Sequence, residues 1–185
     1  MVKKRYIVFN KPYGVLCQFT DEAGRKTLKD YVPIPGIYSV GRLDLDSEGL
    51  LLLTDDGELN HRLSEPRYKQ PKTYWAQIER VPGEEALSAL RSGVLIGKFM
   101  SLPAEVALLS PEPEIWERET PIRFRKTVPT SWLEISIHEG MNRQVRRMTA
   151  AVGHPCLRLI RVAIGPIELG NLAPGEYREI ERPRI

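Results

Sequence analysis

The acidic stretch between Gly41 and Gly57 has the residue types and spacing that could support chemistry. Its acids, which continue to Glu58 without an intervening Lys or Arg, are Asp44, Asp46, Glu48, Asp55, Asp56 and Glu58. Asp44 follows a segment rich in proline and glycine (33–41) and precedes the apolar run Leu50–Leu53. Functional groups are commonly found where an ordered loop meets the edge of a core. We therefore single out Asp44 as a candidate functional carboxylate.

Two other interpretations of the same acids remain open. Asp44, Asp46, Glu48, Gly49 and Asp55 occupy positions 1, 3, 5, 6 and 12 of a calcium-binding loop spacing. Against calcium, the last position holds Asp instead of Glu, and neither flanking helix is predicted. In the third interpretation the acids only solvate a turn. That interpretation fits Asp46, Glu48, Asp55 and Asp56 better than it fits Asp44.

A second segment with chemical potential lies near the other end of the chain and is basic. Between Gly140 and Ile167 there is no acid, whereas five arginines occur there: Arg143, Arg146, Arg147, Arg158 and Arg161. Val145, Met148, Thr149 and Val152 recur at helical spacing, which predicts a helix over 143–152 with one packed and one basic face. Asn142 is the expected N-cap and Gly153 the expected stop. The net charge of +3 is too small to establish a nucleic-acid partner, so this uneven distribution carries more information.

Alternating and apolar runs predict the elements that must position these residues. Strands are predicted over 6–9, 50–54, 73–79, 94–96, 104–108, 133–137 and 157–164, with a further short apolar stretch at 15–19. Helices are predicted over 58–64, 84–91 and 143–152, the second ending at Gly93. Residues 33–41 and 111–129 are predicted to be loops. These elements indicate one domain that mixes helices and strands.

The composition is that of a folded globular protein, with 185 residues, 42% hydrophobic and 28% charged. Cys17 and Cys156 are far apart and have no paired spacing, which indicates a reducing, cytoplasmic compartment. No apolar run is long enough for a membrane span, so no membrane association is expected. The three histidines have no ligand-like spacing. We predict no metal.

Three segments in order resemble the motifs of the pseudouridine synthases that modify bacterial ribosomal RNA. They are the acidic segment 41–57, the tetrapeptide Pro71-Lys72-Thr73-Tyr74 and the basic segment 139–148. The resemblance extends from about residue 6 to residue 179. Residues 18–28 and 129–133 are most similar to the E-type branch of the family, which acts on 23S ribosomal RNA.

The resemblance implies an α+β protein with the pseudouridine synthase fold. In that fold a mixed, mostly antiparallel central sheet is flanked by helices, and two lobes are separated by an active-site cleft. We expect residues 1–185 to form one catalytic domain without the N-terminal accessory RNA-binding domain that many relatives carry. We also expect a monomer. A non-catalytic RNA-binding protein on the same fold is the alternative.

The resemblance also implies roles for individual residues. Asp44 would break the glycosidic bond of a uridine, either by attacking the sugar or by taking a sugar proton, and no cofactor is required. Tyr74 would stack on the flipped uracil, and Arg146 would pair with Asp44 and favour its ionised form. The predicted RNA contacts are Arg42, Lys72, Arg143, Arg147, Arg158 and Arg161. Relatives often have arginine at the positions of Leu45 and Met141, so those contacts are not available in this chain.

Overall fold

The computed structural model describes residues 3–64, 70–123 and 125–185. The chain divides into two compact units, one formed by Met1–Gln70 with Arg161–Ile185 and the other by Pro71–Ile160. Helices and mostly antiparallel strands occur in both, which confirms the α+β prediction. The expected cleft stays a prediction. None of the helices in the described ranges is both long and apolar enough to cross a membrane.

The first unit is built around strand β3, whose side chains are buried along its whole length. Its elements are β1 (Tyr6–Lys11), η1 (Leu28–Asp30), β2 (Tyr38–Ser39), β3 (Glu48–Thr54), α1 (Gly57–Ser64), the end of β9 (Cys156–Ile164), β10 (Ile167–Glu168) and β11 (Tyr177–Ile180). Strand β1 lies between β3 and β11, antiparallel to both, and β2 is antiparallel to β3. Leu50–Leu53 are fully buried. A strand covered on both faces needs an apolar run and not an alternation, which is why the segment reads Leu-Leu-Leu-Leu.

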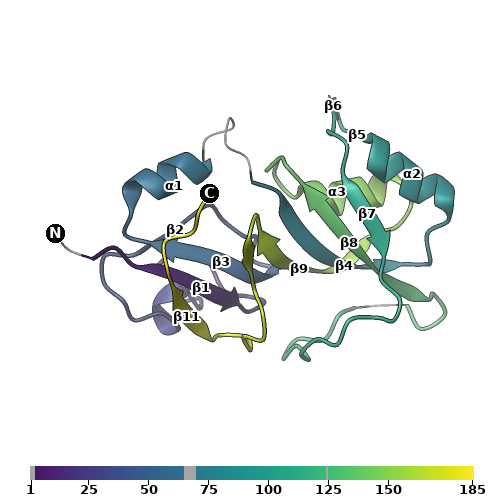
Figure 1. Cartoon of the computed structure of the whole chain (residues 1–185). Helices are drawn as coiled ribbons and strands as arrows, with labels where there is room; N and C mark the ends of the chain where they lie inside the picture. The colour runs from purple at the N-terminus through teal and green to yellow at the C-terminus, as the bar shows by residue number, and fades with distance from the viewer. Residues whose placement is uncertain (1–2, 65–69, 124) are drawn as a thin grey trace. The chain divides into compact units, whose positions relative to one another are not determined.

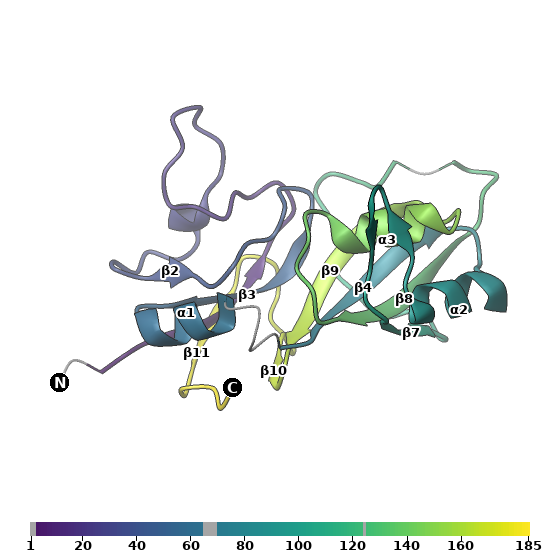
Figure 2. The ribbon, with the colours of Figure 1, turned by 90° about the horizontal axis from the view of Figure 1, so that it is seen from above.

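The second unit has its own set of antiparallel strands. Its elements are β4 (Lys72–Glu79), α2 (Glu84–Ser92), β5 (Leu95–Ile96), β6 (Phe99–Met100), β7 (Glu105–Leu108), β8 (Thr130–Ile137), α3 (Gln144–Ala151) and the first part of β9. The strand order is β9-β4-β8-β7, while β5 and β6 form a separate hairpin. Figures 1 and 2 show α2 and α3 on the same side of these strands. Tyr74, Ala76 and Ile78 are buried, which confirms the predicted alternation.

Several sequence predictions are wrong at the level of local structure. Residues 15–19 do not form a strand, because the backbone at Leu16 and Gln18 closes the base of a loop through hydrogen bonds to residues 26 and 28. Figure 2 shows this loop extending away from the strands of its own unit. The strands β2, β6, β10 and β11 were not predicted, and all of these except β11 have only two residues, too few to show a periodicity. Gly93, by contrast, ends α2 as predicted, with φ 102°.

Helix α3 does not start as predicted. Arg143, and not Asn142, is the N-cap, and it has the left-handed backbone conformation φ 50°, ψ 37° with no capping side chain. The side chain of the next residue, Gln144, instead accepts a hydrogen bond from the Met141 N–H at 3.1 Å. A left-handed conformation is uncommon outside glycine, which is why the residue types of this turn did not predict where the helix begins.

The interpretation of the acids as a solvated turn is wrong for Glu48 and Asp56, which are only 1% and 7% exposed. Asp56 starts helix α1, because its Oδ1 accepts the N–H groups of Glu58 at 3.1 Å and Leu59 at 3.2 Å. Its Oδ2 accepts the Tyr6 hydroxyl at 2.8 Å. Burial would raise the pKa of Asp56, but the hydrogen bonds from Tyr6 and Leu59 and the charge of Arg182 together hold it below its ordinary value.

Asp56→Ala is expected to lower the free energy of unfolding by about 2–4 kcal/mol. About 1 kcal/mol is the lost N-cap, and about 1–3 kcal/mol is the buried Tyr6 hydroxyl left without its acceptor. Because the folded pKa of Asp56 is below 3.8, the difference from wild type should be full above that pH and shrink as the pH falls further. Urea unfolding at pH 7 and pH 3 measures it. Glu58→Ala, an exposed acid in the same turn, should change stability by less than about 0.5 kcal/mol.

Candidate active site

Asp44 lies in the loop between β2 and β3 and is half-buried. The backbone on both sides of it is tied to the same turn. The Leu43 N–H donates to Cys17 Sγ at 3.2 Å, and the Leu45 carbonyl accepts the Gly14 N–H at 2.8 Å. Within its unit, therefore, the backbone at Asp44 is fixed by residues almost thirty positions earlier. Nothing in the spacing of the cysteines indicated that Cys17 accepts a hydrogen bond beside Asp44.

Lys11 is a second residue that sequence reasoning missed, since the segment Asn10-Lys11-Pro12 is typical of the end of a strand and the start of a turn. Its side chain is fully buried at the end of β1. Its Nζ donates to the carbonyls of Pro12 and Val15, both at 2.8 Å. Burial lowers the pKa of Lys11 to about 8, against the opposing attraction of Cys17, Glu48, Asp46 and Asp44. A positive charge therefore acts on the acidic loop from inside the unit.

Lys11 should make the stability of the protein depend on alkaline pH. Its folded pKa of about 8 lies below the ordinary 10.5, so between these values the unfolded chain binds more protons and stability rises with pH. We expect the stability of wild type relative to Lys11→Met to increase by up to about 3 kcal/mol between pH 8 and 10.5. Urea unfolding at several pH values measures this. A constant difference would contradict the buried charge, and Lys29→Met, at an exposed lysine, is the control.

The other two predicted catalytic residues lie in the second unit. Tyr74 is buried on β4, opposite Ile135 of β8. Arg146 is half-buried on α3, and its Nη1 donates to the carbonyl of Cys156 at 3.3 Å. The buried face of α3 is formed by Val145, Met148 and Thr149, as predicted. Tyr74 and Arg146 are thus parts of one unit, and Asp44 belongs to the other.

The predicted RNA contacts differ in exposure. Arg42, Arg143 and Arg147 are exposed, and Lys72 is half-buried. Arg158 and Arg161 are buried, and both have contacts inside the protein. The Arg161 Nε donates to the Leu50 carbonyl at 2.8 Å, and the Arg158 guanidinium lies over the Trp116 ring at 5.7 Å. The exposed arginines are therefore better placed to contact phosphates, which need accessible donors.

The calcium-loop interpretation is wrong. The second half of the twelve-residue spacing, from Glu48 onward, is the buried strand β3, and the element before Asp44 is the short strand β2. A calcium loop of that type needs a flexible loop between two helices. In the described ranges of the chain, no group of three His, Cys, Asp or Glu residues could hold a metal ion.

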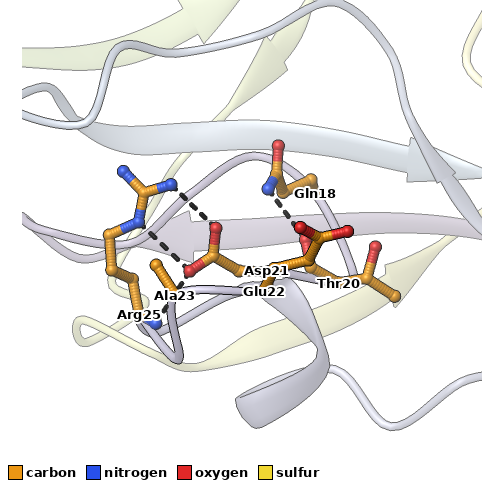
Figure 3. A pocket seen from close by; sticks show the side chains of 6 residues that line it. All are labelled: Gln18, Thr20, Asp21, Glu22, Ala23 and Arg25. Atoms are coloured by element: carbon orange, nitrogen blue, oxygen red, sulfur yellow. Dashed lines mark hydrogen bonds and ion pairs between the residues drawn. The ribbon is translucent and has the colours of Figure 1, made fainter.

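The loop between β1 and η1 carries a separate open pocket of about 670 Å³. It is lined by Gln18, Thr20, Asp21, Glu22, Ala23 and Arg25. Figure 3 shows the Asp21 carboxylate facing the Arg25 guanidinium, and the two form an ion pair at 2.7 Å. The hydrogen bonds from Arg25 lower the pKa of Asp21 to about 2. Asp21 and Arg25 are thus paired with each other, and the pocket contains no predicted catalytic residue.

Comparison with known proteins identifies the class to which this fold and these motifs belong. Residues 5–151 match the family described as RNA pseudouridylate synthase. A solved structure described as a crystal structure of pseudouridylate synthase superposes with a TM-score of 0.77 at 31% identity, covering 98% of this chain and 72% of that one. The chain belongs to the RNA pseudouridylate synthase family and is an enzyme of that class. The predicted fold is confirmed.

Two curated relatives are more similar to this chain in sequence than that solved structure is, and both belong to the same branch of the family. The ribosomal large subunit pseudouridine synthase E of Vibrio parahaemolyticus is 54% identical over 178 residues, which are 96% of this chain and 74% of that protein. The ribosomal large subunit pseudouridine synthase E of Xanthomonas axonopodis pv. citri is 58% identical over 170 residues, 91% of this chain and 90% of that protein. The predicted similarity to the E-type branch is thereby confirmed.

Proposed function

We propose that this enzyme converts one uridine of 23S ribosomal RNA to pseudouridine. The observation that carries the proposal is the 54% and 58% identity to the two E-type pseudouridine synthases across nearly the whole chain. The reaction breaks the bond between N1 of uracil and C1′ of ribose. The uracil then rotates, C5 bonds to C1′ and loses its hydrogen as a proton, and N1 takes up a proton. Because no electrons are gained or lost overall, the isomerisation needs no cofactor.

Asp44 supplies the carboxylate in this proposal. It either attacks the sugar to form a covalent intermediate or takes a proton from it, and both routes need the ionised form. Arg146 provides the opposite charge that favours this form. Tyr74 stacks on the flipped uracil, since base flipping replaces neighbouring bases with aromatic side chains. The support for these three roles is their position in the motifs, together with the half-buried state of Asp44 and Arg146 and the burial of Tyr74.

RNA contact in this proposal comes mainly from Arg42, Arg143 and Arg147, with Lys72 beside Tyr74 on β4. Their exposure supports it, because sequence-independent phosphate contacts position an RNA on the protein. The enzyme then acts as a monomer on 23S ribosomal RNA. Such binding should weaken steeply with added salt, since each neutralised phosphate releases counterions.

The test is tritium release from unmodified 23S ribosomal RNA labelled at C5 of uridine. The isomerisation must expel that hydrogen, whereas binding alone cannot. Release of about one equivalent per RNA is expected, and 16S RNA labelled in the same way is the control. Chemical mapping of pseudouridine in the product locates the modified position. Release from 16S RNA alone would contradict the proposed substrate, and binding without any release would support the non-catalytic alternative.

A further inference from the structure

The hairpin β5–β6 of the second unit carries an exposed apolar surface. Its four large side chains, Leu95, Phe99, Met100 and Leu102, are 59%, 64%, 64% and 52% exposed. Single exposed apolar residues are ordinary, but a cluster within eight residues indicates contact with a partner. We propose that this hairpin is an RNA-contact surface, in which Phe99 stacks on an unpaired base of the substrate RNA and Met100, on the opposite face of β6 beside Leu95, adds apolar contact with the RNA.

Hydrogen bonds hold the backbone of the hairpin in place, so its exposed side chains are kept in defined positions. The Ser101 N–H donates to the Val94 carbonyl, and the Val94 N–H donates to Ser101 Oγ, both at 2.9 Å. Between them Ile96 is buried at 3% exposure. Gly93 allows the two ends to approach closely, since a Cβ there would lie 2.4 Å from the Ser101 carbonyl oxygen. A preorganised surface loses little conformational entropy when it binds.

The charges around the hairpin favour a polyanion as its occupant. No acid occurs from Ser92 to Ala104, and Lys98 lies at the turn. Arg147 of α3 joins the hairpin directly, because its Nη2 donates to the Ile96 carbonyl at 3.3 Å. The acid that contacts the hairpin is Glu139, whose carboxylate accepts the Leu102 N–H at 3.0 Å and a hydrogen bond from Gln144. Its carboxylate is therefore engaged by two donors of its own unit.

An aromatic side chain beside cations is the combination that binds unpaired RNA. Bases stack on aromatic rings without regard to their identity, while Lys and Arg contact the backbone. The flexible thioether of Met100, on the other face of the strand, adds contact area that adapts to its partner. A second copy of this chain would find the same apolar side chains, but also the same two cations facing it. Like charges disfavour that contact, whereas RNA phosphates favour it.

The inference rests on the proposed function only for the identity of the RNA. None of the hairpin residues is proposed to touch the reacting atoms, so the hairpin should contribute to RNA affinity and not to the chemical step. Loss of a stacking contact should raise KM for the RNA and leave kcat unchanged. An effect on KM without an effect on kcat would distinguish the hairpin residues from Asp44, Tyr74 and Arg146, which are proposed to act in the chemical step.

The experiment compares Phe99→Ala, Met100→Ala and Phe99→Trp with wild type. The probes are unmodified 23S RNA for KM and kcat by tritium release, and poly(U) for Kd by fluorescence anisotropy. Phe99→Ala is expected to raise KM and Kd at least about fivefold, the lower limit for losing one stacked base, and Met100→Ala is expected to raise them less, with kcat within about twofold of wild type in both. Phe99→Trp should restore affinity. Val81→Ala, at a position 58% exposed in the same unit, is the matched control and should change neither constant.

Three outcomes would overturn the inference. One is an unchanged KM and Kd in both alanine variants whose circular dichroism spectra are those of wild type. Another is a loss shared equally by Val81→Ala, which would indicate a general effect of exposed apolar area. The third is a wild-type dimer in sedimentation velocity that Phe99→Ala dissociates, which would assign the surface to a second copy. The poly(U) measurement remains informative even if 23S RNA releases no tritium, so the two proposals fail separately.

Discussion

Asp44→Asn is expected to reduce tritium release from 23S RNA by at least about 10³-fold while leaving the Kd for the RNA unchanged. A positioned acid or base contributes about 10²–10⁴-fold to a reaction, and a covalent nucleophile contributes more. Asparagine has nearly the same size and shape as aspartate but can neither attack the sugar nor accept a proton from it. The backbone bonds at Leu43 and Leu45 do not involve the Asp44 side chain, so the loop should keep its conformation.

Asp46→Asn is the matched control, since Asp46 is a half-buried acid two residues further along the same loop. Both changes remove one negative charge from the surroundings of Lys11, and their effects on stability should therefore be similar. Only the Asp44 variant should lose the reaction, with less than about a tenfold effect for Asp46→Asn. Comparable tritium release by wild type and Asp44→Asn would remove Asp44 from the mechanism.

Arg146→Met is expected to be the second most damaging change, with a loss of about 10²–10³-fold in kcat. At about 4 Å and an effective dielectric constant near 20, a pair of opposite charges attracts by about 4 kcal/mol. Without its cation, the ionised carboxylate required for the reaction would be less favoured. Arg146→Lys keeps the charge but lacks the planar guanidinium, and it should recover part of the activity. Single-turnover tritium release at saturating RNA measures kcat separately from binding.

Arg147→Met tests whether the effect of Arg146 comes from pairing with Asp44 or from a general attraction of arginines to RNA. Arg147 is the next residue on α3 and is exposed. Its loss should raise KM and reduce the salt dependence of binding by about one counterion, with little change in kcat. If Arg146→Met and Arg147→Met both act on KM alone, Arg146 is an RNA contact and not the partner of the carboxylate. Unfolding of each variant in urea checks that lost packing is not the cause.

Local residue patterns were sufficient to predict several features of the fold. Alternation identified β4 and the burial of Tyr74, and helical spacing identified the packed face of α3. The apolar run Leu50–Leu53 identified the central strand of its unit. The motifs that contain Asp44, Tyr74 and Arg146 indicated the family. Side-chain periodicity follows from backbone geometry, so a strand or helix face can be recognised without knowing what packs against it.

Local patterns did not reveal which polar residues are buried or which groups they bond, because both depend on contacts between distant segments. Lys11, Glu48 and Asp56 look like surface residues in the sequence, and so do Arg158 and Arg161, yet all of them are buried. Asp56 accepts a hydrogen bond from Tyr6 fifty positions earlier, and Arg161 donates to Leu50. A charged side chain can be buried only where partners offset its lost hydration, and such partners are brought together by the fold.

The candidate site shows the same division between local and long-range information. Its candidate residues were indicated by the resemblance of three sequence motifs to those of the family. The hydrogen bond from Leu43 to Cys17 and the exposed hairpin β5–β6 were not predictable. Each depends on segments that are distant in the sequence or on a two-residue strand, where local periodicity contains no signal. The energy of such contacts exists only once the chain has folded and those segments meet.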